Sequence, residues 1–352
     1  MAGPARKPRA PSKAPQRRVR LQDVADRAGV SKSVASRVLN GDPSLSARTE
    51  TRDRVLAAAR ALGYRPDPVA RALASSLTGA LALLVPSFDN PAYTPIIRGA
   101  YQRARERGFI LMSAEDFEAQ QADEAFTEMV EAGRVDGLLI ASALPARPLL
   151  AALNRHWVPH VFVNRSVPGA TSNVVLEVAS ASRLALEHLA GLGHVRLGHV
   201  AGPAKIEAAR RREKAFLIAA RERGLPDVAV SRGAFSVPAG EACTARLLTE
   251  HPELTAIYAS SFVQAVGALR AATRHKRRVP EDLSLIAYED VPLAGYLSPP
   301  LTTIAMPMEK LGCRAVDMLL DQIAGKEPQI EILDGAPQFV ERDSTQPPPS
   351  AR

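Results

Sequence analysis

The sequence predicts a small all-α headpiece of the helix-turn-helix type, followed by a larger α/β core with parallel sheets. Residues 19–62 hold short helical stripes of apolar side chains separated by turn residues. From residue 80 onward, short apolar runs alternate with helical segments instead. Charge divides the chain at the same place, because residues 1–78 hold 16 Lys and Arg but 6 Asp and Glu, whereas the remainder carries −2 of the overall +8. This asymmetry indicates a polyanionic partner for the headpiece alone; the alternative is an incidental solvated basic face.

The headpiece begins with two helices joined by a Gly-containing turn. Leu21 opens an apolar stripe with i, i+3, i+4 and i+7 spacing, which predicts the first helix. Ser31 is a suitable N-cap for the second helix, which ends at the turn signal Asn40-Gly41. We expect Val34 and Val38 to face inward; the pattern does not decide whether Ala35 joins them. The outward side carries small polar and basic groups, which is typical of a helix-turn-helix.

The segments that flank these two helices are predicted from composition and caps. A third helix is expected over residues 49–62, ended by Gly63 and Pro66. Residues 1–18 are rich in Pro, Ala, Lys and Arg and are predicted to form a disordered basic arm. The linker 66–77 contains helix-forming residues, but so short a helix is unstable alone in water, so we expect it to order only against DNA and a second subunit.

The core is predicted to alternate strands with helices. Strands are expected over residues 80–85, 109–112, 137–140, 160–163, 197–200, 256–259 and 283–286. Helices are expected over residues 95–107, 120–132, 148–154, 180–192, 210–223, 240–250 and 263–274. This alternation predicts parallel sheets, and so many units favour two sheets over one.

Composition also bears on where the chain works. The longest apolar run, residues 80–85, is too short to span a bilayer, and no apolar segment follows the basic N-terminus as a secretory signal would require. Cys243 and Cys313 are the only cysteines, which suits a reducing compartment. We expect a cytoplasmic protein that lies on the chromosome when it binds DNA.

Together these residues resemble the LacI/GalR family of bacterial transcription regulators over about residues 19–345. The headpiece motifs that carry the resemblance are residues 23–25, 28–31, 36–41, 62–66 and 69–73. Those in the core are residues 90–91, 135–138, 188–189, 192–194, 201–203, 279–284 and 300–304.

The resemblance implies a domain plan and a function. It implies a DNA-binding domain at 19–65, a hinge helix at 66–77 and an effector-binding and dimerisation domain at 78–345, with a disordered tail at 346–352. The core would be periplasmic-binding-protein-like, with two Rossmann-like subdomains. Such proteins are usually homodimeric repressors that read a pseudo-palindromic operator and respond to a small molecule held between the subdomains. No cofactor or metal is implied.

Residue roles follow from the match in register. Base contacts are expected from Lys32, Ser33 and Arg37, and phosphate contacts from Ser31, Ser36, Asn40 and Tyr64. Ala70 and Leu73 match the hinge, where a Leu pair is expected to wedge into the minor groove. The alternatives are a solvated helix face for the base-reading set and a core position for Leu73.

The effector site is expected at Tyr93, Arg212, Phe235, Ser261 and Glu289. An aromatic platform with an Arg and a carboxylate suits a polar ligand such as a sugar or nucleobase, although each residue could instead be structural. Ser261-Phe262 stands where the family usually has Asn-Asp, and residues 287–289 stand for its usual Gly-Phe-Asp, which argues against an ordinary hexose. Arg20 stands where a Thr would cap the first helix.

Two rival classes are less consistent with the sequence. A solute-binding receptor would share the α/β core, but the helix-turn-helix and the lack of a signal peptide argue against it. An enzyme on a Rossmann-like scaffold is disfavoured because the chain has no Gly-x-Ser-x-Gly elbow, no Gly-rich phosphate loop with Lys and no metal-ligand spacing.

Overall fold

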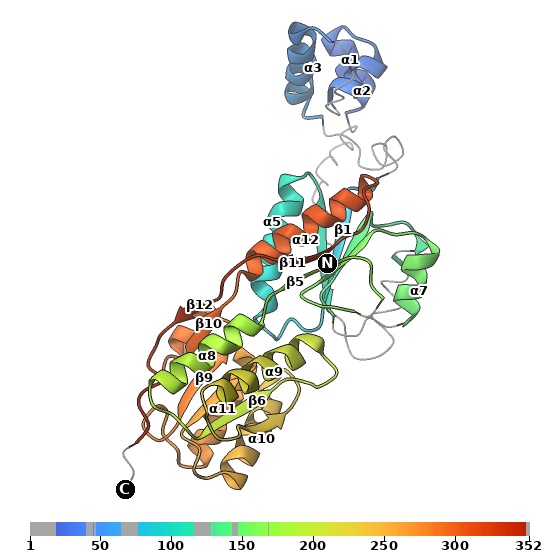
Figure 1. Cartoon of the computed structure of the whole chain (residues 1–352). Helices are drawn as coiled ribbons and strands as arrows, with labels where there is room; N and C mark the ends of the chain where they lie inside the picture. Colours follow the sequence, from blue (N-terminus) through green and yellow to red (C-terminus); the bar gives the residue numbers. More distant parts are fainter. Residues whose placement is uncertain are drawn as a thin grey trace, which may run out of the picture. The chain divides into compact units, whose positions relative to one another are not determined.

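The computed structural model describes residues 19–39, 45, 47–64, 77–115, 128–129, 131–142, 147–167 and 169–349. The chain divides into two compact units, Met1–Thr78 and Gly79–Arg352 (Figure 1), and each is described by itself. Among the described residues, none of the helices combines the length and apolar character that crossing a bilayer requires.

The first unit packs three short helices around small side chains. They are α1 (Leu21–Ala28), α2 (Lys32–Leu39) and α3 (Thr49–Leu62). Ser31 caps α2 as predicted, because its Oγ accepts a hydrogen bond from the Val34 N–H at 3.3 Å. Ala35 is fully buried whereas Val34 is only half-buried, so the inward face of α2 is centred on Ala35 and Val38.

The start of α1 shows how the chain manages without a capping hydroxyl. Arg20 occupies the N-cap, and its side chain makes no capping hydrogen bond. Instead, the Arg20 N–H donates to the Asp23 Oδ2 at 2.7 Å. The Asp23 N–H in turn donates to the Arg20 main-chain carbonyl at 3.0 Å, in place of the side-chain acceptor that Ser or Thr would supply.

The second unit holds two six-stranded sheets, which confirms the prediction of more than one. The first sheet has the order β11-β5-β4-β3-β1-β2, with all its strand pairs parallel. Its strands are β1 (Ala80–Val85), β2 (Ile110–Glu115), β3 (Gly137–Ile140), β4 (His160–Val163), β5 (Asn173–Leu176) and β11 (Ile330–Leu333). Its helices are α5 (Tyr93–Glu106), α7 (Arg147–Arg155) and α12 (Met308–Ile323), whereas most of the helix predicted over 120–132 lies outside the described residues.

The second sheet has the order β12-β10-β9-β8-β6-β7, with only β12 antiparallel. Its strands are β6 (Leu197–Ala201), β7 (Ala229–Arg232), β8 (Ala256–Ala259), β9 (Ser284–Tyr288), β10 (Thr302–Ala305) and β12 (Gln338–Val340). The accompanying helices are α8 (Ala179–Gly191), α9 (Glu207–Glu222), α10 (Val237–Glu250), α11 (Phe262–Arg274) and the 3-10 turn η1 (Pro292–Tyr296).

Three chain crossings join the two subdomains: from β5 to α8, from β10 to α12 and from β11 to β12 (Figure 1). The middle crossing returns α12 to the first subdomain, where it packs on α5. Gly99 and Gly312 let these helices approach closely, because a Cβ at either position would overlap main-chain oxygen of the opposite helix. The two subdomains are therefore connected by three separate segments of the chain.

The C-terminal tail is ordered beyond the predicted boundary at residue 345. The Gln346 N–H donates to the Ser284 Oγ at 3.0 Å. The Gln346 carbonyl lies 2.8 Å from His194 Nε2 and accepts from the Ser284 hydroxyl at 2.9 Å. These main-chain bonds hold Gln346 on the second subdomain, which corrects the expectation of disorder from 346; residues 350–352 lie outside the described residues.

Candidate functional site

The outer side of α2 is the candidate DNA-reading surface. Ser31, Lys32 and Ser33 are exposed, while Ala35 and Val38 anchor the opposite side in the core. Arg37 is half-buried and lies one turn after Ser33, so the two share a helix face. Gly29 adopts φ +64 in the turn before α2, a left-handed conformation that suits glycine, and so fixes how α2 leaves α1.

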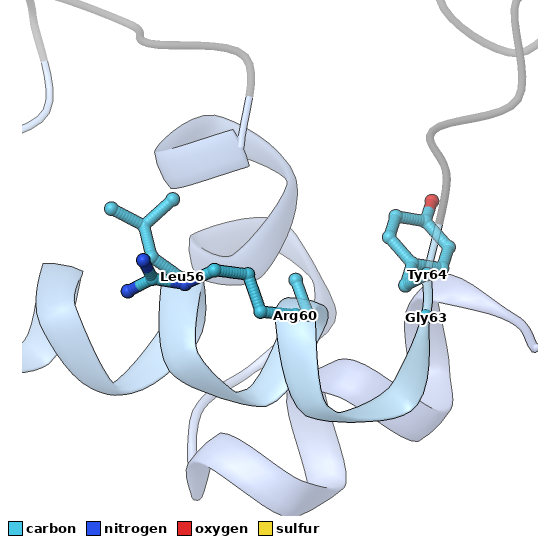
Figure 2. Close-up of a pocket in the computed structure, with 5 residues that line it drawn as sticks. Leu56, Arg60, Gly63 and Tyr64 are labelled. Carbon is cyan, nitrogen blue, oxygen red and sulfur yellow. The ribbon is translucent and has the colours of Figure 1, made fainter.

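The end of α3 places Tyr64 beside this bundle. Gly63 ends the helix at φ +62, and the Tyr64 N–H donates to the Ala59 carbonyl at 2.9 Å. Figure 2 shows the stem of Arg60 running back along α3 toward Leu56, with Tyr64 beyond the helix end. The three side chains border a shallow hollow together with Ala59 and Gly63. Ser36, a further predicted phosphate contact, is half-buried in α2, whereas the predicted DNA contacts Asn40, Ala70 and Leu73 lie outside the described residues.

A cleft between the two subdomains brings together four of the five predicted effector residues. Tyr93, Arg212, Phe235 and Glu289 all line it. The other lining residues are Asn90, Asn164, Arg165, Val178, Ala208 and Tyr288. Most of these follow the carboxyl ends of parallel strands, where ligand sites of open α/β sheets form.

Arg212 lies in α9 with its guanidinium between two aromatic rings. Its Cζ is 4.3 Å from the ring centroid of Tyr288 and 5.2 Å from that of Phe235, so both rings stabilise the cation. The residue is only 5% exposed, and its Nε has no hydrogen-bond partner among the described residues. A buried donor without an acceptor is unfavourable, so this nitrogen is available to a ligand.

Glu289 supplies the one carboxylate of the cleft lining. Burial raises its pKa to about 7, against the opposing attraction of Arg212, so the carboxyl is near its midpoint at neutral pH. Its Oε2 accepts a long hydrogen bond from the Phe262 N–H at 3.4 Å. Glu289 also has φ +78, a left-handed conformation that is costly outside glycine and is concentrated at functional sites.

Arg165 was not predicted, and it forms the opposite wall of the cleft. Its Nη2 donates to the Tyr93 hydroxyl at 2.8 Å, and its Nε donates to the Ala141 carbonyl at 3.2 Å. Burial raises the pKa of Tyr93, while Arg165 acts in the opposite direction. The signal that could have found Arg165 is its position, because it lies two residues after the end of the apolar strand 160–163.

Ser261 is the predicted effector residue that does not line this cleft. Its Oγ accepts the Gln264 N–H at 3.3 Å and donates to the Gln264 side-chain oxygen at 3.2 Å, so it caps α11. Gln264 in turn donates to the carbonyls of Ala201 and Ala234. The structure thus gives Ser261 a structural role at the N-terminus of α11, and its ligand contact stays a prediction.

The cleft is nearly filled by its own side chains. About 20 Å³ is open to the centre of a water-sized sphere, which is roughly the room that one water molecule needs. A ligand larger than water therefore requires some rearrangement of the residues that line the cleft. No group of His, Cys, Asp and Glu suited to a metal ion occurs in the described part of the chain.

Comparison with known proteins matches both units. Residues 20–67 match the bacterial regulatory proteins of the lacI family, and residues 186–345 match a periplasmic binding protein-like domain. The HTH-type transcriptional repressor CytR of Escherichia coli strain K12 is 32% identical over 311 residues, which cover 87% of this chain and 90% of the relative. The repressor PurR of Escherichia coli O139:H28 is 32% identical over 329 residues, covering 92% and 96%.

Solved structures agree with these relatives. The lac repressor dimer bound to operator and the anti-inducer ONPF superposes with a TM-score of 0.74 at 30% identity, covering 93% of this chain and 99% of that one. The complex of the transcriptional regulator CelR with cellobiose gives a TM-score of 0.71 at 30% identity, covering 93% and 100%. The chain belongs to the lacI family of bacterial regulatory proteins and is a DNA-binding transcriptional regulator with an effector-binding, periplasmic-binding-protein-like core.

Proposed function

We propose that this regulator is a repressor that binds a pseudo-palindromic operator as a homodimer, and that a small molecule in the subdomain cleft changes its affinity for DNA. The observation that carries the proposal is the outer face of α2, where Lys32 and Ser33 are exposed and Arg37 follows one turn on. A helix of this kind fits the major groove, where the first turns of a recognition helix reach base edges.

Each predicted DNA contact has a separate role in this proposal. The planar guanidinium of Arg37 donates two hydrogen bonds to a guanine, and Lys32 and Ser33 contact neighbouring bases. Phosphate contacts come from Ser31, Ser36, Asn40 and Tyr64, and they fix the register of the headpiece on the duplex. The linker 66–77 supplies the minor-groove hinge through Ala70 and Leu73, between a headpiece at 19–65 and a core at 78–345.

Exposed apolar side chains in the core support the homodimer. The strand β2 is an edge of its sheet, and it exposes 69% of Ile110 and 37% of Met112. The helix α5 packs against β2 and leaves Tyr101 54% exposed. Proteins usually protect an apolar sheet edge, so this surface suits contact with a second copy of the chain.

The cleft offers a physical route for regulation. Its lining comes from both subdomains, so a ligand that bridges them favours one relative arrangement over others. The similar CelR and lac repressor structures were solved with the small molecules cellobiose and ONPF, respectively. A polar metabolite is the proposed effector class, and the site of action is the cytoplasm, where the chromosome lies.

Selection of bound DNA from a random pool tests the proposal. A homodimeric reader should enrich a palindrome with two half-sites at one fixed spacing, because protein symmetry is mirrored in the operator. An enriched single half-site would contradict the dimer. Enrichment of no sequence at all would contradict specific DNA reading by α2.

A further inference from the structure

The cleft carries more positive charge than its own residues neutralise. Arg165 and Arg212 both line it, at 7% and 5% exposure, and Glu289 is the one carboxylate of the lining. Neither arginine forms an ion pair in the part of the chain that the structure describes. Elsewhere, the more exposed Arg314 pairs with Glu331 and Arg342 pairs with Asp290.

Buried charges in proteins are normally paired or hydrogen-bonded, because removing them from water is costly. One carboxylate carries a single negative charge, so it cannot neutralise two guanidinium cations. Glu289 is moreover partly protonated at neutral pH, since burial raises its pKa to about 7. The cleft therefore keeps at least one cation without a counter-charge.

Three buried groups of the cleft keep hydrogen-bonding capacity for a ligand. The Arg212 Nε–H and the Tyr288 hydroxyl are both buried without a partner among the described residues. The Tyr93 hydroxyl accepts from Arg165, so its own proton remains to be donated. Each of these three groups can donate a hydrogen bond to an anionic ligand.

We propose that the effector of this regulator is an anion, a small molecule whose carboxylate or phosphate group binds between Arg165 and Arg212. Guanidinium groups match both oxyanions in geometry, and charge-assisted bonds of this kind are the strong ones. Because the two arginines come from different subdomains, one anionic group joins the walls of the cleft. The inference rests on the proposed function for the choice of cleft.

The first test uses the full chain and a matched set of sugars that differ only at carbon 6: glucose, glucuronate and glucose 6-phosphate. Inorganic phosphate and acetate serve as minimal anions, and ionic strength is fixed throughout. An anionic probe should raise the midpoint of thermal unfolding by about 5 °C or more near 100 times its Kd. Neutral glucose should not, and the two charged sugars distinguish carboxylate from phosphate.

Matched variants connect the effect to the cleft. The rise should disappear in Arg212→Gln and in Arg165→Gln, so the test survives if one of them fails to fold. Arg183→Gln is the control, because Arg183 is half-exposed and pairs with Glu222 outside the cleft. Equal stabilisation by glucose, no stabilisation by any anion, or an effect that persists in both cleft variants would each overturn the proposal.

Operator binding is measured separately, so the two proposals can fail independently. A glucose effect that Arg212→Gln removes would leave the cleft as an effector site but for a neutral ligand. Failure of the DNA selection would remove operator reading and leave the anion result in place.

Discussion

An arginine of the headpiece and an arginine of the core lie in opposite environments. In the headpiece, Arg37 lies beside exposed Lys32 and Ser33 on a helix face that water reaches. In the core, Arg212 lies between the rings of Phe235 and Tyr288, with one nitrogen lacking a partner. The solvated environment imposes little desolvation penalty on the cation, and the positive charge attracts a polyanion over a long range. The buried environment is costly, and a ligand is what would satisfy it.

Removing either charge should have a different consequence. The largest expected effect is the loss of operator affinity in Arg37→Ala. Losing a bidentate guanine contact costs about 1–3 kcal/mol of discrimination in each half-site, and a dimer has two. Operator affinity should therefore fall steeply, with preference relaxed at one symmetric pair of positions. Binding titrations on the selected operator and on unrelated DNA measure this. An unchanged preference profile would remove Arg37 from the base-reading set.

The free energy of unfolding of the protein should depend on pH through the cleft residue Glu289. Below about pH 4.5 its carboxyl is protonated in both the folded and the unfolded state. Between about pH 4.5 and pH 7 only the folded state keeps the proton, because burial raises the folded pKa to about 7. This carboxyl therefore lowers the free energy of unfolding as pH rises through that window, and the loss is complete above pH 7.

Glu289→Gln should remove that loss, because the amide is never charged. The difference between a pKa of 4.5 and one of about 7 corresponds to about 3 kcal/mol. The variant should thus be more stable than the natural chain at pH 8 and equal to it near pH 4.5 in denaturant unfolding. Glu187→Gln, at an exposed position, should show no such difference. A Glu289 variant that is less stable at pH 8 would mean that the ionised carboxylate stabilises the fold.

What the sequence could predict differs between the two units for a physical reason. The helices of the headpiece follow from caps and spacing within a few residues, such as Ser31 before α2 and Gly63 after α3. The cleft forms only where distant strand ends meet, so local sequence patterns do not identify Arg165 as part of its lining. Short edge strands were also missed, because β7 buries one of its four residues and has no apolar run to detect.

The smallest effect should come from the headpiece itself, at the cap of α1. Arg20 leaves the first turn without a side-chain acceptor, whereas Asp23 already accepts the Arg20 N–H. Arg20→Ser would complete the capping box, and a good N-cap contributes about 1 kcal/mol. Hydrogen exchange of the α1 amides in the full chain measures the gain. Because position 20 lies far in sequence from every cleft residue, the response to anionic probes should stay unchanged; a lowered protection of α1 would mean that Arg20 stabilises the turn in another way.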